Sequence, residues 1–248
     1  MRLLKNIKSH RNWINYYIAK YFNKNNKGFC FKTRNGLDIS VPSRMLHTYK
    51  ECFFDEVYTN GFPENTINNA PVVIDIGANV GYFSLFILNK FPQAKVFSFE
   101  PMPGNFKLLN KYKNENPSLA FNIFNKAVSN TNETIVLAYN ADDSFTTSAT
   151  IFNNSGQSDT VTVSAITLAS IIEENKLDKI DLLKLDCEGS EYKILYQCPS
   201  NQFKRISAIC LETHKGENEN ENTRSLAQFL QERGFCTKVE GDIIWGWR

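Results

Sequence analysis

The strongest constraint on the fold is a repeated order of short strand, turn and helix that begins at residue 71. The first run, Val72–Ile76, is continuously apolar apart from Asp75, which is typical of a strand buried on both faces of a parallel sheet. Three later runs follow the same order. The four strands are expected at 72–76, 95–99, 180–185 and 206–211, and the helices after them at 82–90, 105–114, 189–198 and 223–233. This alternation predicts an α/β protein with a mostly parallel sheet between helices.

Shorter segments complete the expected layers. We expect a third strand of the sheet at 120–125, extra strands at 134–139 and 160–164, a helix at 167–175, and a hairpin of 235–239 with 243–247. The hairpin closes the chain and is expected to add an antiparallel edge to the sheet.

The first 70 residues lack this alternation, so we expect a helical and hairpin extension at 1–70 before the main domain at 71–248. Residues 1–27 are predicted to form a basic amphipathic helix. We favour a packed helix with a solvated basic face, and contact with a membrane surface or an anionic substrate is the alternative. Asn35-Gly36 between alternating apolar residues predicts a hairpin at 28–42. A second helix is expected at 44–60, before a linker.

Composition narrows the functional class. The chain has 248 residues, 28 basic and 26 acidic, so its net charge of +2 gives no electrostatic case for binding nucleic acid. Apolar residues make up 42%, which excludes a disordered chain. The six cysteines form no CxxC pair, so we predict no metal site of the zinc type. The absence of an apolar leader or membrane span leads us to expect a cytoplasmic protein.

The first chemistry-bearing motif lies on the turn after Val72–Ile76. It reads Asp75-Ile-Gly77-Ala78-Asn79-Val-Gly81. Glycines let the backbone approach a ligand, and the helix that follows presents free N–H groups. The spacing differs from the G-x-G-x-x-G dinucleotide fingerprint, which disfavours an NAD-dependent oxidoreductase. A generic glycine turn is the alternative interpretation.

The second motif is Glu100-Pro101 at the end of the next strand. A carboxylate at this position accepts hydrogen bonds from both hydroxyls of a ribose. It therefore indicates an adenosine ligand without distinguishing NAD from S-adenosylmethionine. The alternative is a charge that stabilises the following helix, which Pro101 makes less favourable.

Three carboxylates and a histidine form the third group of candidates. Asp186 ends a strand, and Glu188 and Glu191 open the next helix, where they share a face. A reaction at a hydroxyl group requires a base to take the proton, and Asp186, Glu188 or His214 are our candidates. An ordinary imidazole pKa of about 6.5 suits that role. For Glu191 we favour complementation of the helix dipole. The group Asp186, Glu188 and Glu212 has oxygen ligands that suit Mg²⁺, but we do not predict a metal.

Taken together, these motifs resemble the FkbM family of S-adenosylmethionine-dependent methyltransferases. The resemblance rests on residues 72–84, Phe99–Phe106, Asn125–Ser129 and Leu183–Glu191, with the K-x-D-x-E-G-x-E run at 184–191 the most specific. It implies a Rossmann-like class I fold with seven strands and S-adenosylmethionine as cofactor. It also implies these cofactor-binding residues: Asp75, Gly77, Ala78, Asn79 and Gly81 for the methionine and ribose; Glu100 for the ribose hydroxyls; Pro101, Met102, Ala127 and Val128 for the adenine; and Asp186 facing the methyl group.

Members of this family mostly methylate hydroxyl oxygens of sugars or polyketide-type molecules. We therefore expect an O-methyltransferase whose acceptor is a saccharide or glycan precursor. The alternatives are a ribose 2′-O methyltransferase built on Lys184, Asp186, Lys215 and Glu212, and a non-catalytic adenosyl-binding scaffold. The near-neutral charge disfavours the RNA enzyme. The sequence leaves self-association open.

Overall fold

A seven-stranded sheet forms the centre of the protein, as expected. The computed structural model describes residues 7, 9–22, 28–139 and 159–248. The strands stand in the order β11-β12-β10-β9-β3-β4-β5, and only β12 runs against its neighbours. Their bounds are β3 (Val72–Ile76), β4 (Lys95–Phe99), β5 (Phe121–Phe124), β9 (Leu182–Leu185), β10 (Ala208–Glu212), β11 (Cys236–Glu240) and β12 (Ile243–Trp247).

The closing hairpin differs from the expectation in one respect. The antiparallel strand β12 lies inside the sheet, between β10 and β11, and the edge strand β11 runs parallel to β10. Burial explains this order. Ile244 and Trp245 of β12 are buried, whereas β11 is largely exposed. The more apolar strand of the hairpin therefore takes the inner position.

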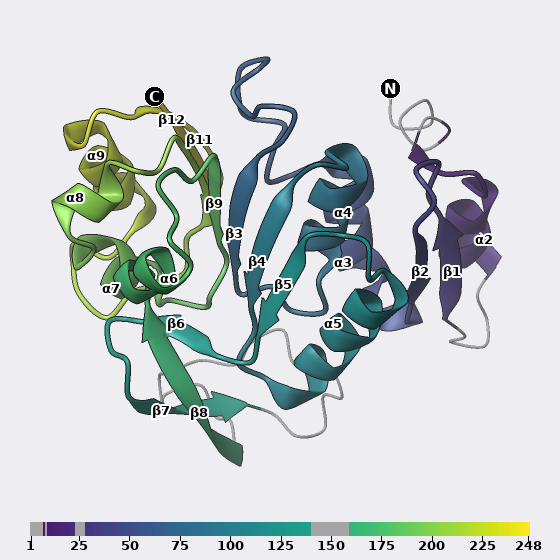
Figure 1. The fold of residues 1–248 in the computed structure, drawn as a ribbon, viewed down its shortest axis with the longest axis horizontal. Helices are drawn as coiled ribbons and strands as arrows, with labels where there is room; N and C mark the ends of the chain where they lie inside the picture. The colour runs from purple at the N-terminus through teal and green to yellow at the C-terminus, as the bar shows by residue number, and fades with distance from the viewer. Residues whose placement is uncertain (1–6, 8, 23–27, 140–158) are drawn as a thin grey trace.

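Helices cover both faces of the sheet (Figure 1). Successive residues of β3 point to opposite faces of the sheet: Val73 packs with α4 on one face, and Ile74 packs with α6 and α7 on the other. One layer holds α4 (Tyr82–Lys90) and α5 (Pro103–Glu115), and the other holds α6 (Leu168–Glu174), α7 (Glu191–Tyr196), α8 (Ser200–Phe203) and α9 (Thr223–Glu232). The predicted helix at 82–90 is confirmed.

The amino-terminal elements pack on α4, which explains their place. Residues 82–89 of α4 are all buried, and a helix that is apolar on every side needs cover on the face turned from the sheet. The predicted hairpin is confirmed: β1 pairs antiparallel with β2. The elements here are α2 (Ile14–Phe22), β1 (Phe29–Lys32), β2 (Asp38–Val41), η1 (Ser43–Met45), α3 (Leu46–Lys50) and the π-helical η2 (Glu51–Asp55).

Two predicted helices of this region are shorter than expected. A single helix over 1–27 is wrong for the described residues, because His10 forms a β-bridge with Thr33 and α2 begins only at Ile14. The helical stretch within 44–60 ends at Asp55, because Glu56 takes a left-handed backbone with φ of 51°. Tyr58 therefore lies in a turn. None of the helices in the described ranges has the length and apolar character needed to cross a membrane.

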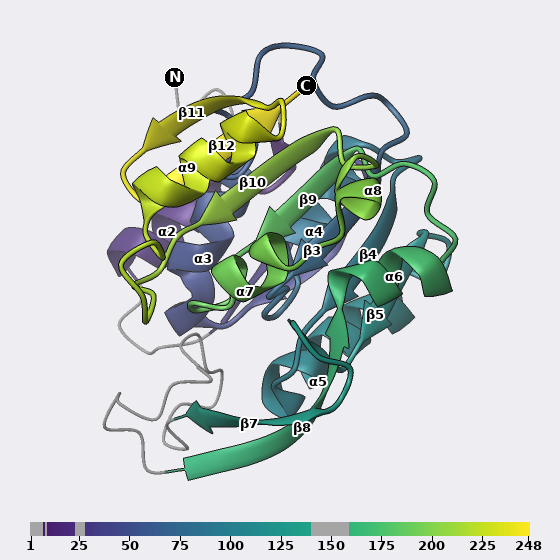
Figure 2. The ribbon, with the colours of Figure 1, turned by 90° about the vertical axis from the view of Figure 1, so that its left-hand side faces the viewer.

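A small second sheet stands beside the carboxyl ends of the central strands (Figure 2). Its strands are β6 (Ala127–Ser129), β7 (Thr134–Tyr139) and β8 (Asp159–Thr167), in the order β6-β8-β7. The extra strands at 134–139 and 160–164 are thus confirmed, and they belong to this separate sheet. Leu137 and Ala127 pack against Met102, so the second sheet forms one wall beside the turn after β4.

Candidate functional site

A pocket of about 670 Å³ opens at the carboxyl ends of β3, β4 and β9. Strand β3 has β4 on one side and β9 on the other, and ligands of open α/β sheets bind at such a point. Nine predicted site residues line the pocket: Gly77, Asn79, Glu100, Pro101, Met102, Ala127, Val128, Asp186 and Glu188. The other lining residues are Ile76, Phe99, Asn105, Ile135, Leu137, Cys187 and Ser190.

Three residues assigned to the cofactor from the resemblance lie outside this lining and shape the turn instead. Asp75 is fully buried and accepts a hydrogen bond of 2.6 Å from the Ser84 hydroxyl. Ala78 donates its backbone N–H to the Phe99 carbonyl. Gly81 caps α4 with φ of 92°, and a Cβ there would lie 2.4 Å from Leu109.

Gly77 brings the turn after β3 against the turn after β9. Its φ is 71°, and a Cβ on it would lie 1.8 Å from the Asp186 carbonyl oxygen. No side chain fits in that space, and a positive φ also disfavours other residues, so glycine is required here. The close approach places the first motif directly beside Asp186.

Glu100 closes the β4 side of the pocket. One carboxylate oxygen accepts the Asn79 N–H at 2.8 Å, and the other accepts the Met102 N–H at 2.9 Å and the Asn105 amide at 3.3 Å. Burial raises the pKa of Glu100 to about 7. The three hydrogen bonds favour the charged carboxylate and oppose this rise, but they do not cancel it. A cationic or hydroxyl-bearing ligand would favour its ionised form.

Asn79 lines the pocket and carries a side-chain oxygen that the fold does not use. Its backbone is left-handed, with φ of 51°, a conformation that asparagine tolerates better than most residues. Its side-chain oxygen is buried and has no hydrogen-bond partner within the described residues. Since a buried acceptor without a partner is costly, this atom is suited to a ligand donor.

Lys184 connects the turn after β3 with the turn after β9. It stands opposite Asp75 in the register of β9 and β3, with its ammonium 3.2 Å from the Asp75 carboxylate and 3.7 Å from that of Asp186. It also donates a 2.8 Å hydrogen bond to the Gly77 carbonyl. Burial disfavours the ammonium charge, but the two carboxylates outweigh it and raise the Lys184 pKa above its ordinary value. The sequence interpretation gave Lys184 a role only in the RNA alternative.

Glu191 organises the β9 side of the site. Its side chain is fully buried; one oxygen accepts the Cys187 N–H at 3.0 Å and the other the Gly189 N–H at 2.9 Å. His214 Nδ1 lies 2.9 Å from the first oxygen. We expected Glu191 to complement the helix dipole. It does stand in the first turn of α7, but its bonds also fold the 187–189 turn and fix the histidine.

His214 is held among three carboxylates. Its Nε2 lies 3.9 Å from Asp186 and 3.7 Å from Glu188, in addition to the Glu191 contact. Burial lowers the pKa of the imidazole, but Glu191, Glu188 and Asp186 outweigh it and raise the pKa to about 9. At neutral pH the ring is therefore mostly protonated. A neutral imidazole base, as the ordinary pKa suggested, does not fit this setting.

Glu188 faces the pocket from a left-handed backbone with φ of 53°. Burial raises its pKa to about 7; His214 opposes the rise, and Asp186 and Glu191 add to it. Backbone strain of this kind at a non-glycine residue is typical of functional sites. Glu188 thus combines pocket exposure with a pKa suited to proton transfer near neutral pH.

Tyr58 is a site residue that the sequence analysis missed. Its hydroxyl donates to Asp186 Oδ2 at 2.8 Å and lies 3.3 Å from Glu212 Oε2, so it bridges the ends of β9 and β10. The Trp245 indole holds the neighbouring Val57 carbonyl at 3.2 Å. A single tyrosine within a predicted helix carries no sequence signal of this role.

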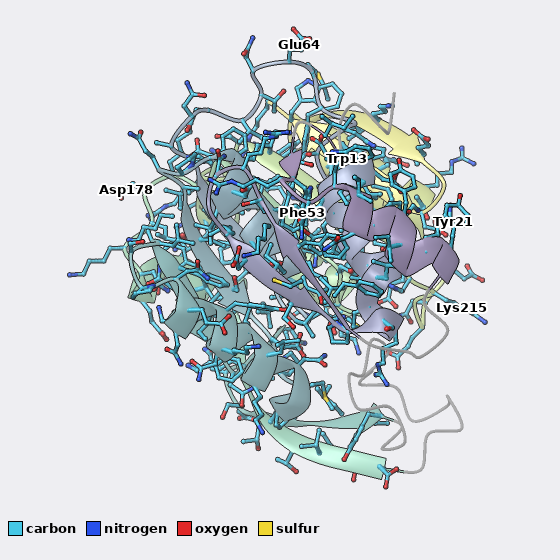
Figure 3. All side chains as sticks on the ribbon, turned by 90° about the vertical axis from the view of Figure 1, so that its right-hand side faces the viewer. Trp13, Tyr21, Phe53, Glu64, Asp178 and Lys215 are labelled. Carbon is cyan, nitrogen blue, oxygen red and sulfur yellow. The ribbon has the colours of Figure 1, made fainter. Side chains whose placement is uncertain are left out.

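The structure does not assemble the set expected for an RNA ribose methyltransferase. Lys184 is buried between Asp75 and Asp186, whereas Lys215 is exposed and points into solvent (Figure 3). Within the described ranges, no three His, Cys, Asp or Glu side chains are arranged to hold a metal ion.

Comparisons with known proteins identify the family of this chain. A family model described as the methyltransferase FkbM domain matches residues 75–236. The chain is 25% identical over 223 residues to the 31-O-demethyl-FK506 methyltransferase FkbM of Streptomyces tacrolimicus, covering 79% of this chain and 84% of that protein. It is 24% identical over 160 residues to the hexuronic acid methyltransferase AglP of Haloferax volcanii, covering 63% of this chain and 62% of that protein.

A solved structure shares the fold. The crystal structure of a methyltransferase FkbM from Methylobacillus flagellatus superposes with a TM-score of 0.51 at 13% identity, covering 83% of this chain and 54% of that one. The fold is thus the class I methyltransferase fold that the resemblance implied. The family match spans both the first turn, with Asp75 and Gly77, and the Lys184–Glu191 segment, and the chain belongs to the FkbM methyltransferase family.

Proposed function

We propose that this protein transfers a methyl group from S-adenosylmethionine to a hydroxyl oxygen, and that the acceptor is a saccharide or glycan precursor. One observation carries the proposal. A single pocket has Glu100 after β4 on one side of β3, and Asp186 with Glu188 after β9 on the other. This arrangement provides a site for a cofactor and, next to it, carboxylates for an acceptor.

The pocket residues fit S-adenosylmethionine. Glu100 offers carboxylate oxygens for ribose hydroxyls, and the apolar side chains of Phe99, Val128 and Leu137 suit an adenine ring. Asn79 adds an unused acceptor. Asp186 supplies negative charge for a cationic group at the opposite side. When bound, the cofactor supplies a methyl group on a sulfonium, which is already activated for transfer.

The protein then has to align the acceptor and remove one proton. Asp186 is fixed by Tyr58, Lys184 and the turn after β3, which gives the alignment that an in-line transfer requires. Glu188, with a pKa of about 7, is our first candidate for the proton acceptor, and Asp186 is the second. His214, being cationic at neutral pH, holds these carboxylates rather than taking the proton.

The names of two relatives support the acceptor class. One acts on an O-demethyl compound, whose methyl group is added to oxygen, and the other acts on a hexuronic acid. Asp186, Glu188 and Glu212 outnumber the cations beside them, Lys184 and His214, so we favour a neutral hydroxyl acceptor here over an acidic one such as the hexuronic acid of the second relative. Neutral sugars are therefore the first acceptors to test.

The test is a methyl-transfer assay with labelled S-adenosylmethionine against neutral sugars, amino sugars, uronic acids and a hydroxylated polyketide. We expect O-methylation of a neutral hydroxyl compound. Glu188→Gln should lower kcat at least about a hundredfold, the lower end of the range for proton-transfer groups, and Asp186→Asn should also lower it, because Asp186 aligns the acceptor. Asp178→Asn, at an exposed site, serves as the matched control. Transfer to an amine or carboxylate alone, or full activity of Asp186→Asn, would contradict the proposal.

A further inference from the structure

The charge of the protein is concentrated at its amino-terminal end. Residues 1–27 contain seven of the 28 basic residues and none of the 26 acidic ones, so they carry +7. The remaining 221 residues hold 21 basic and 26 acidic residues, a net charge of −5. The small overall charge therefore hides a strong asymmetry, and such a basic segment attracts an anionic surface.

Helix α2, within this segment, has an apolar stripe that the fold leaves uncovered. Ile14, Ile18 and Tyr21 stand at i, i+4 and i+7 and are 53%, 46% and 63% exposed. Tyr16, on the opposite side, is 3% exposed and packs edge-on against Phe54. Three of the five exposed large hydrophobic side chains among the described residues belong to this one helix.

The stripe faces outward and has basic neighbours. Figure 3 views the molecule with α2 in front and Tyr21 at its outer side, and Figure 1 shows α2 as the outermost layer, beyond β1. The Lys20 ammonium lies 5.0 Å from the centre of the Tyr21 ring, and Arg11 is exposed just before the helix. Exposed aliphatic and aromatic side chains beside Lys and Arg are the pattern of helices that lie in a membrane interface.

We propose that α2 docks this protein on an anionic membrane surface, with Ile14, Ile18 and Tyr21 inserted among the lipids and the basic side chains on the headgroups. The helix lies on the bilayer, in keeping with the absence of a spanning helix from the described residues. This inference is independent of the proposed methyl transfer. If both hold, acceptors attached to lipids would be delivered to the enzyme at the membrane.

Two other occupants fit the face less well. A nucleic acid would use the basic side chains but would leave the aliphatic Ile14 and Ile18 without a function. A second copy of the chain requires about 800 Å² from each partner in a stable dimer, which three half-exposed side chains on a nine-residue helix do not supply. A membrane needs only a few inserted side chains, because each basic residue adds to the attraction.

The test is sedimentation of the full chain with vesicles of phosphatidylcholine containing roughly one third phosphatidylserine. We expect binding that weakens at least about tenfold on pure phosphatidylcholine or at high salt. The double variant Ile18→Glu/Tyr21→Glu should bind at least about tenfold more weakly. Val136→Glu and Val239→Glu are matched controls, since these valines are 54% and 47% exposed on β7 and β11. They should bind within about twofold of the wild type.

Several results would overturn the docking proposal. They are equal binding of the double variant and the controls, no difference between the two lipid compositions, or no vesicle binding at all. A concentration-dependent dimer lost in the double variant would assign the face to a second copy. Calorimetry of S-adenosylmethionine binding to the same variants separates the two proposals: an intact cofactor site with lost vesicle binding supports docking, whatever the acceptor assay shows.

Discussion

Replacing Glu191 by glutamine tests how the site is held together. In the wild type this fully buried carboxylate accepts two backbone N–H groups and contacts His214 at 2.9 Å. Glutamine keeps the shape but offers one oxygen and one NH₂ group. Whichever way the amide turns, an NH₂ group meets a backbone N–H donor, and the negative charge beside His214 is lost. The 187–189 turn should therefore be less stable, and the protonated form of His214 should be less favoured.

The expected cost follows from the pKa of His214. Its rise from 6.5 to about 9 corresponds to roughly 3 kcal/mol of favourable interaction with the charged ring. Because the folded-state pKa is the higher one, this stabilisation is complete below pH 6.5, declines as the pH rises, and is lost above about pH 9. Glu191 is the largest favourable contributor. Adding the unmade backbone hydrogen bond, we expect Glu191→Gln to cost about 2–4 kcal/mol at pH 7.

The assay combines urea unfolding at several pH values with an NMR titration of the three histidines. In the variant, the His214 pKa should fall well below 9, and the stability difference from wild type should shrink between pH 7 and pH 10. The buried His10, far from Glu191 in the fold, is an internal control, and Glu240→Gln on exposed β11 is a matched variant. An unchanged His214 titration, or a stability loss below about 0.5 kcal/mol, would refute this reasoning.

Three further predictions concern other parts of the protein. Tyr58→Phe should lower kcat about tenfold with S-adenosylmethionine affinity nearly unchanged. It should also raise the pKa of Glu212, because the Tyr58 hydroxyl stabilises the charged form of that carboxylate. A pH–rate profile in an acceptor assay checks the change in kcat and the change in the Glu212 pKa. Gly77→Ala should destabilise the fold by more than about 2 kcal/mol in urea unfolding, because its Cβ meets a backbone carbonyl at positive φ; wild-type stability would contradict this. His10 is buried against Tyr49, and burial lowers its pKa to about 4, so stability should be complete above pH 6.5 and fall as the pH drops towards 4. His10→Gln should reduce that slope in urea titrations, and an unaltered slope would argue against the assignment.

The central sheet was predictable because its signals are local. The run Val72–Ile76 is apolar on both faces, and the helix at 82–90 follows a glycine turn, so both match the structure residue for residue. The second sheet was only partly predictable. Strands β7 and β8 were expected, but β6 was not. It pairs with β8 across some 38 residues of sequence, and no periodic pattern reveals such a partner.

The site also has a part that was predictable from the sequence and a part that was not. Glu100 and Asp186 were expected in the pocket because each directly follows a strand of the parallel sheet. The roles of Lys184 and Tyr58 depend on contacts between distant segments: Lys184 meets Asp75 through the register of β9 and β3, and Tyr58 reaches Asp186 over 128 positions. The charge state of His214 likewise depends on neighbours that only the folded chain brings together.

The most direct test of the account is calorimetric titration of the protein with S-adenosylmethionine, S-adenosylhomocysteine and NAD. We expect both adenosyl ligands to bind, with affinity lost at least about tenfold in Glu100→Gln and retained in the control Glu115→Gln, which lies on the exposed side of α5. Unfolding curves show whether each variant is folded. Binding of NAD alone, or adenosyl binding that is indifferent to Glu100, would contradict the assignment of this pocket to the methyl donor.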